Sequence, residues 1–257
     1  MFIPYVCCGD PSIEFTEKLV RTLAPHADII ELGIPFSDPI ADGKTIQAAA
    51  NRALANGVTV EKIFGMVERL RANGTDKIEV PLVFMTYFNV IFAYGKEKFL
   101  KRMKAVGVQG LIIPDLPFGE DLEFESLANA YGISIINLIA PNTTDERAKQ
   151  ILEKSRNAHA LFTYLVSSAG TTGTKEGVSA NSIEFVKRIR TLAGNQNKLC
   201  VGFGISNAGQ AKQFIEAGAD GIIVGSRIIE IYSEHAEQED ALKEIEQFAL
   251  CSNGKSI

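Results

Sequence analysis

Eight short apolar stretches alternate along the chain with longer amphipathic stretches, and this alternation limits the folds open to it. The apolar stretches span residues 2–7, 27–33, 81–87, 110–115, 133–140, 160–166, 199–205 and 220–226. They are apolar throughout rather than at every second residue, which is typical of parallel strands covered on both faces. The stretches between them carry apolar residues at helical spacing, and several end in glycine. Eight such units in 257 residues predict an α/β protein, a single (β/α)8 TIM barrel domain over residues 1–257.

The main alternative for this pattern is an open, doubly wound sheet. That fold usually carries a glycine-rich phosphate-binding turn after its first strand. The residues at that place are CCGDPS, 7–12, which do not form such a turn. The sequence contains no repeat beyond the strand–helix units, no low-complexity segment and no linker, so the barrel is favoured.

Composition argues against several other classes of protein. The net charge is −5 and there is no basic stripe, so we expect no nucleic-acid partner. No apolar run approaches the roughly eighteen residues of a membrane helix, and the opening MFIPYV lacks a basic leader. Four cysteines and three histidines show no metal-ligand spacing, so no metal site is expected. We predict a cytoplasmic protein with reduced thiols.

The stretch ELGIPFSDPIADGKTIQ, residues 31–47, places three carboxylates at the end of the second predicted strand. Glu31 can project into the mouth of the barrel, where apolar neighbours would raise its pKa and let it carry a proton near neutral pH. Asp42 could hold an ionised carboxylate opposite, so that the pair divides acid and base roles. Structural roles remain open, with Glu31 in an ion pair and Asp42 capping the next helix. Asp38, within Ser-Asp-Pro, fits a turn.

Two connections near the end of the barrel indicate a phosphate site. The seventh and eighth strands end in GFGIS, 202–206, and VGSR, 224–227, and barrels often bind phosphate between these two loops. Glycine lets backbone N–H groups approach an oxyanion, and a helix N-terminus adds favourable partial charge. The predicted contacts are Gly204, Gly225, Ser226 and, from the long polar connection 167–182, Gly173. Simple turns at the glycines and a helix cap at Ser226 are the alternative.

Further polar and aromatic residues follow the third, fourth and sixth strands. Tyr87, Asn89 and Asp115 are possible ligand contacts, although Tyr87 could equally be core and Asn89 a turn residue. Tyr164 could line an aromatic pocket or simply pack. The connection 167–182 is rich in Gly, Ser and Thr, which is typical of a mobile lid at the active face of a barrel.

Seven motifs together make the sequence resemble the alpha chain of tryptophan synthase. In chain order they are FIPYVCCGDPS, ELGIPFSDPIADGKTIQ, MTYFNVIFAYG, GLIIPDLPFGED, TYLVSSAGTTG, GFGIS and ADGIIVGS. The resemblance covers nearly the whole chain. Its most specific part is the stretch that begins at Glu31, whereas GFGIS and VGS are shared more widely among phosphate-binding barrels.

The resemblance implies cleavage of indole-3-glycerol phosphate to indole and glyceraldehyde 3-phosphate, without a metal or organic cofactor in this chain. It implies that Glu31 is the general acid and base and that Asp42 accepts the indole N–H. Tyr164 would border the substrate, Thr172 would reach Asp42 when the lid closes, and Phe2 would lie beside the indole. Gly173, Gly204, Gly225 and Ser226 match the phosphate contacts of the family.

The resemblance also implies a partner. Asp38 and Pro39 match the stretch that contacts a beta chain carrying pyridoxal phosphate, and Asn89 and Pro117 match other parts of that contact. The expected assembly has two alpha and two beta chains, with indole passing through the joint interface.

The sequence departs from the family pattern in four places, one of which is the adjacent pair Cys7-Cys8. It starts almost at the first strand, so we expect a barrel with a shortened N-terminus and a less covered bottom. Ser168 stands where many relatives have a large or basic residue, and Pro141-Asn142-Thr143 stands where relatives often have Pro-Thr. None of these positions is Glu31 or Asp42.

Three other functions stay open at this level. One is an isomerase or synthase acting on another phosphorylated intermediate, although no lysine stands at a strand end here. Another is a regulatory subunit that binds a phosphorylated ligand without turnover. The last is a stand-alone lyase that releases free indole.

Overall fold

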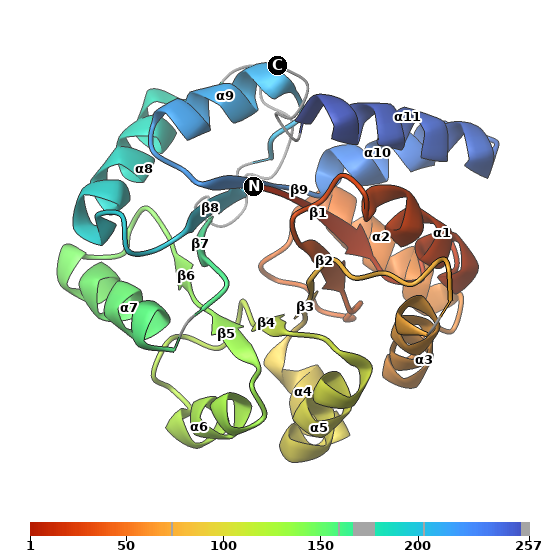
Figure 1. The fold of residues 1–257 in the computed structure, drawn as a ribbon, viewed down its shortest axis with the longest axis horizontal. Helices are drawn as coiled ribbons and strands as arrows, with labels where there is room; N and C mark the ends of the chain where they lie inside the picture. Colours follow the sequence, from red (N-terminus) through yellow and green to blue (C-terminus); the bar gives the residue numbers. More distant parts are fainter. Residues whose placement is uncertain (73, 159, 167–177, 203, 253–257) are drawn as a thin grey trace.

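The structure is a computed structural model, and it describes all residues except 73, 159, 167–177, 203 and 253–257. Its strands form a closed ring inside an outer ring of helices (Figure 1). The strands are β1 Phe2–Cys7, β2 Ile30–Gly33, β3 Leu82–Met85, β4 Gly110–Ile112, β5 Ser134–Ile136, β6 Leu138–Ile139, β7 Thr163–Val166, β8 Leu199–Gly202 and β9 Gly221–Val224. All of the pairings between them are parallel, in the order β5-β4-β3-β2-β1-β9-β8-β7-β6. The predicted TIM barrel is confirmed.

The predicted fifth strand, 133–140, is interrupted, so the described barrel has nine strand segments rather than eight. β5 pairs with β4, and β6 pairs with β7. Between the two segments, the carbonyl of Asn137 accepts a hydrogen bond from the amide of Tyr164 at 3.0 Å. The strand therefore changes neighbour at Asn137, and the ring closes through it.

The helices are those expected from the periodicity, together with two short ones. They are α1 Ile13–Leu23, α2 Lys44–Ala55, α3 Val60–Arg71, α4 Phe88–Tyr94, α5 Lys96–Val106, α6 Leu122–Ala130, α7 Asp145–Asn157, α8 Ala180–Ala193, α9 Ala208–Glu216, α10 Ser226–Glu234 and α11 Gln238–Ser252. Six of them begin at a side-chain cap that accepts a backbone N–H, at Ser12, Thr59, Asp121, Thr144, Ser179 and Asn207. The short helices α4 and α10 directly follow β3 and β9.

The core has two parts, separated by the wall of strands. Most of the larger part lies between the strands and the helices, although it includes Tyr5 at the cavity, and the smaller part fills the barrel with side chains such as Ile3, Val83, Ile112 and Phe162. Successive residues of a strand point to opposite faces. Phe2 accordingly packs in the outer part while Ile3 packs in the inner part.

Among the described residues, no helix is long and apolar enough to cross a membrane. The same residues hold no group of three or more His, Cys, Asp and Glu side chains suited to a metal ion.

Candidate active site

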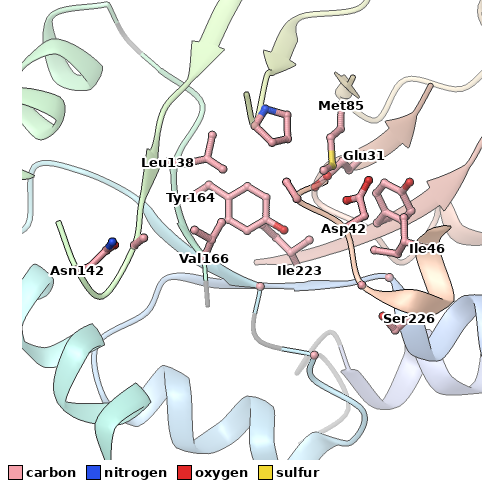
Figure 2. Close-up of a pocket in the computed structure, with 18 residues that line it drawn as sticks. Glu31, Asp42, Ile46, Met85, Leu138, Asn142, Tyr164, Val166, Ile223 and Ser226 are labelled. Carbon is pink, nitrogen blue, oxygen red and sulfur yellow. The ribbon is translucent and has the colours of Figure 1, made fainter. Parts of the chain in front are cut away.

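A cavity of about 320 Å³ opens at the carboxyl ends of the strands. Its walls bring together residues from β1, β2, β7, β9 and the connections that follow them (Figure 2). Of the residues predicted from the sequence, Glu31, Asp42, Tyr164, Gly204, Gly225 and Ser226 line this cavity. The cavity is therefore the candidate active site, at the face where barrel enzymes place their chemistry.

Glu31 stands inside the barrel, where no described residue pairs with it. It lies in register with Tyr5 on β1 and Val83 on β3, and its side chain is completely buried. Neither carboxylate oxygen has a hydrogen-bond partner among the residues that the structure describes, so the ion-pair alternative finds no support there. Burial, and next the charge of Asp42, raise the pKa of Glu31 from 4.5 to about 8.

Asp42 faces the same space from the connection after β2. Burial raises its pKa to about 6, while a hydrogen bond from the hydroxyl of Tyr87, 3.0 Å from Oδ2, acts in the opposite direction. The helix-cap alternative is wrong, because Gly43 is the N-cap of α2 and no side chain caps that helix. Figure 2 shows the two carboxylates directed toward one region of the cavity, with the ring of Tyr164 also extending into it.

The two carboxylic acids differ in protonation near neutral pH. With pKa values of about 8 and about 6, Glu31 is mainly protonated and Asp42 mainly ionised at pH 7. Two acids with pKa values set apart by their environments can act as a proton donor and an anionic stabiliser in one reaction.

The other polar end of the cavity suits a phosphate group. Gly225 is the N-cap of the nine-residue helix α10, whose first residue is Ser226, and both residues line the cavity. Gly204 lines it as well and has a φ of +67°, a conformation that glycine adopts readily. A Cβ atom on Gly225 would lie 3.0 Å from the ring of Tyr5, so this wall leaves little room for a side chain.

The structure places Tyr5, not Phe2, at the aromatic position beside the cavity. Phe2 is 1% exposed, packs in the outer part of the core and is absent from the cavity wall. The expectation for Phe2 is therefore corrected, and the physical reason is the alternation of β1. Tyr5 is two residues after Ile3 and therefore points to the same face of β1, toward the inside of the barrel. This alternation can be read from the sequence and identifies Tyr5.

Glycines make room for the two tyrosine rings in the barrel. A Cβ atom on Gly33 would lie 2.2 Å from the hydroxyl of Tyr5, and one on Gly202 would lie 2.5 Å from the hydroxyl of Tyr164. Both glycines are thus required by the packing of rings that line the cavity.

Two residues that line the cavity, Tyr5 and Asn142, have no role assigned from the sequence. For Tyr87, which lies behind Asp42, the sequence leaves a ligand contact and a core position both open. Asn142 lines the cavity from the connection after β6. Its position depends on the path of that connection, for which the sequence carries no signal.

Not every predicted site residue can be placed. Thr172 and Gly173 lie outside the described residues. Asp38, Asn89 and Pro117 are exposed and Pro39 is half-buried, and none of these four lines the cavity. Asp38 and Pro39 follow β2, Asn89 lies in α4 just after β3, and Pro117 follows β4. These three strands are neighbours in the sheet, so the four positions follow one side of the barrel rim.

The raised pKa of Glu31 predicts a pH dependence of stability. In the unfolded chain the group has its ordinary pKa of 4.5, and in the folded protein about 8. Between these values the folded state binds more protons, so the free energy of unfolding should fall as the pH rises, by up to about 1.4 kcal/mol per pH unit. Urea unfolding of Glu31→Gln should show a flatter dependence in this window. Glu153→Gln, at an exposed position of α7, is the control. Equal slopes for wild type and Glu31→Gln would contradict the assignment.

Comparison with known protein families identifies a match over nearly the whole chain. The family model described as "Tryptophan synthase alpha chain" matches residues 1–255. A tryptophan synthase alpha chain of Methanocaldococcus jannaschii is 42% identical over 247 residues, covering 96% of this chain and 84% of that protein. One from Methanosarcina acetivorans is 46% identical over 233 residues, covering 90% and 80%.

Solved structures give the same result. The tryptophan synthase A-subunit of Pyrococcus furiosus superposes with a TM-score of 0.87 at 38% identity, covering 98% of this chain and 97% of that one. A chain from the tryptophan synthase a2b2 complex of the same organism superposes with a TM-score of 0.86 at 36% identity, with the same coverage.

Proposed function

Because this chain belongs to the tryptophan synthase alpha chain family, we propose that it acts, as one barrel domain, as a lyase on indole-3-glycerol phosphate. The products would be indole and glyceraldehyde 3-phosphate. The observation that carries the proposal is Glu31, buried and without a hydrogen-bond partner among the described residues, beside Asp42 at the wall of one cavity. A buried carboxyl group without a partner costs stability, and a protonated acid poised for transfer accounts for retaining it.

Glu31 begins the reaction as an acid. With a pKa of about 8 it carries a proton at neutral pH, and it donates this proton to C3 of the indole ring. The ring then carries a positive charge that is shared with its nitrogen. The Glu31 carboxylate next takes the proton of the glycerol hydroxyl adjacent to C3. The carbon–carbon bond breaks, its electron pair returns to the ring, and the hydroxyl carbon becomes the aldehyde. Glu31 ends protonated, as it began.

Asp42 stabilises the charge that develops on the ring. Its pKa of about 6 leaves it ionised at neutral pH, so it can accept the indole N–H. This interaction strengthens as the ring becomes positive, which is the kind of interaction that raises kcat. The apolar wall that suits the indole includes Ile46, Met85 and Leu138.

The phosphate group would bind at Gly204, Gly225 and Ser226. The N-terminus of α10 offers backbone N–H groups and favourable partial charge, and Ser226 adds a hydroxyl donor. Gly173 and Thr172 stay predictions as further contacts. The steps above need no organic cofactor in this chain, and pyridoxal phosphate is proposed only for the beta chain. The cytoplasmic location also stays a prediction.

The direct test is indole release from indole-3-glycerol phosphate by the purified chain, alone and with a beta chain added. Slow release alone and strong activation by the partner are expected. Fast release that the partner does not change would favour a stand-alone lyase. No release in either case, with a phosphorylated ligand still bound, would favour the regulatory subunit or another substrate and would overturn the proposal.

We further propose that a beta chain docks on the rim formed by the connections after β2, β3 and β4. Ile40, Phe92 and Leu122 are large apolar side chains that are 81%, 66% and 63% exposed. They lie within five residues of Pro39, Asn89 and Pro117, the positions predicted for this contact. Exposed apolar side chains grouped on one face are typical of a protein interface. By analogy with the a2b2 complex from Pyrococcus furiosus, the assembly would hold two chains of each kind.

Phe92→Asp should weaken binding of the beta chain by about tenfold to a hundredfold, because it places a charge in an apolar contact. Indole release by the chain alone should not change, since Phe92 does not line the cavity. Ile215→Asp on α9, across the barrel in Figure 1, is a matched control at a position 45% exposed. Titration with the beta chain measures the effect, and equal affinities for the two variants would place the interface elsewhere.

A further inference from the structure

Tyr87 connects the loop that carries Asp42 to the rigid end of β3. It is the residue before α4 and is its N-cap, two residues after the end of β3, and only 3% of it is exposed. Three contacts join its side chain to the loop. The amide of Ala41 lies 2.9 Å from its hydroxyl oxygen, Asp42 Oδ2 lies 3.0 Å from the same oxygen, and its ring stacks on Phe36 with centroids 5.1 Å apart.

The direction of these hydrogen bonds is fixed by the chemistry of the groups. A backbone amide can only donate, so the hydroxyl oxygen of Tyr87 accepts the bond from Ala41. The hydroxyl proton is then free to point at Asp42, whose ionised carboxylate can only accept. A protonated Asp42 could still accept this bond through its carbonyl oxygen, but the ionised carboxylate is the stronger acceptor. The arrangement therefore favours the ionised form and fixes the orientation of the carboxylate.

We propose that Tyr87 is a positioning residue, whose hydroxyl keeps Asp42 ionised and oriented for the ligand N–H. For the reaction, the inference rests on the proposed lyase function. The catalytic proton transfers remain with Glu31. Tyr87 acts only through Asp42, because it is absent from the cavity wall.

Apart from Tyr87, no described group around Asp42 lowers its pKa. Burial raises its pKa, and the Tyr87 hydrogen bond is the interaction that lowers it. The titratable side chains that interact with it electrostatically from the neighbouring strands are Tyr5 and Cys7 on β1, Glu31 on β2 and Tyr164 on β7. None of these described groups is a cation. The charge of Asp115 contributes to raising the pKa of Tyr87 rather than that of Asp42. Its carboxylate accepts a hydrogen bond from the amide of Phe88 at 2.8 Å.

Tyr87→Phe tests the inference, because it removes only the hydroxyl and keeps the ring that stacks on Phe36. Without the hydroxyl, the pKa of Asp42 should rise by about one unit, since a hydrogen bond to a charged group favours the ionised form. The acid limb of the pH profile of kcat/KM should move to higher pH by the same amount. At neutral pH, kcat/KM should fall about tenfold to a hundredfold. Tyr131→Phe is the matched control, because its hydroxyl bonds to Glu97 on the surface, 2.9 Å away.

Two readouts separate this inference from the proposed function. Titration of the Asp42 carboxyl carbon by NMR, with aspartate labelled at that carbon and Asp42→Asn used for assignment, needs no substrate. An unchanged titration in Tyr87→Phe would overturn the inference whether or not the wild type releases indole. If the Asp42 titration shifts in Tyr87→Phe but the wild type releases no indole, the positioning of Asp42 is supported and only the proposed lyase function is overturned. A shifted titration with an unmoved acid limb would overturn the role of Tyr87 in the reaction.

Discussion

Glu31→Gln should lower kcat for indole release by about 10²- to 10⁴-fold, which is the range that a positioned general acid and base contributes. The amide has nearly the size of the carboxylic acid but can neither give a proton to C3 nor take one from the hydroxyl. The barrel should still fold, because the wild-type carboxyl has no described partner for the substitution to break. Substrate affinity should change little, since the substitution removes the proton transfers of the reaction rather than contacts that bind the substrate.

The measurement is steady-state indole release, with the beta chain present and absent. Glu153→Gln, on the exposed face of α7, serves as the matched control and should retain full activity. A Glu31→Gln variant within threefold of the wild type would remove Glu31 from the mechanism, and the proposal would lose its main support.

Asp42→Asn should lower kcat by about 10²- to 10³-fold, the usual effect of removing one group aimed at a developing charge. The amide oxygen can still accept the hydrogen bond from Tyr87, so the geometry should be largely kept. The negative charge is lost, and the loss should appear more in kcat than in KM, because the ring is most positive in the transition state.

The same variant has a second, independent readout. The charge of Asp42 helps to raise the pKa of Glu31, so Asp42→Asn should lower that pKa and move the alkaline limb of the rate profile to lower pH. Asp240→Asn, on the surface of α11, is the control. An alkaline limb that stays in place would mean that the two carboxyl groups do not interact as the structure indicates.

Much of the barrel could be predicted from periodicity alone. The apolar runs identified the positions of all of the parallel strands, because a strand covered on both faces has no polar side to interrupt it. The interruption at Asn137 could not be predicted, since the stretch 133–140 is apolar on both sides of it and the break depends on which strand each half pairs with. The short helix α4 could not be predicted, because seven residues give too little helical periodicity.

The sequence by itself determined that Glu31 would lie in the second strand and Asp42 on the connection that follows it, because chain order and apolar runs are local properties. It also located Gly204 and Gly225, which line the cavity. Whether the carboxylates were paired or capped a helix depended on what other parts of the chain bring to them, and only the tertiary structure decided this. Burial without a described partner sets the pKa of Glu31, and the hydroxyl of Tyr87, 45 residues away in the chain, orients Asp42. Such contacts join side chains from different strands and connections of the folded barrel, so they cannot be inferred from the residues adjacent to them in the sequence.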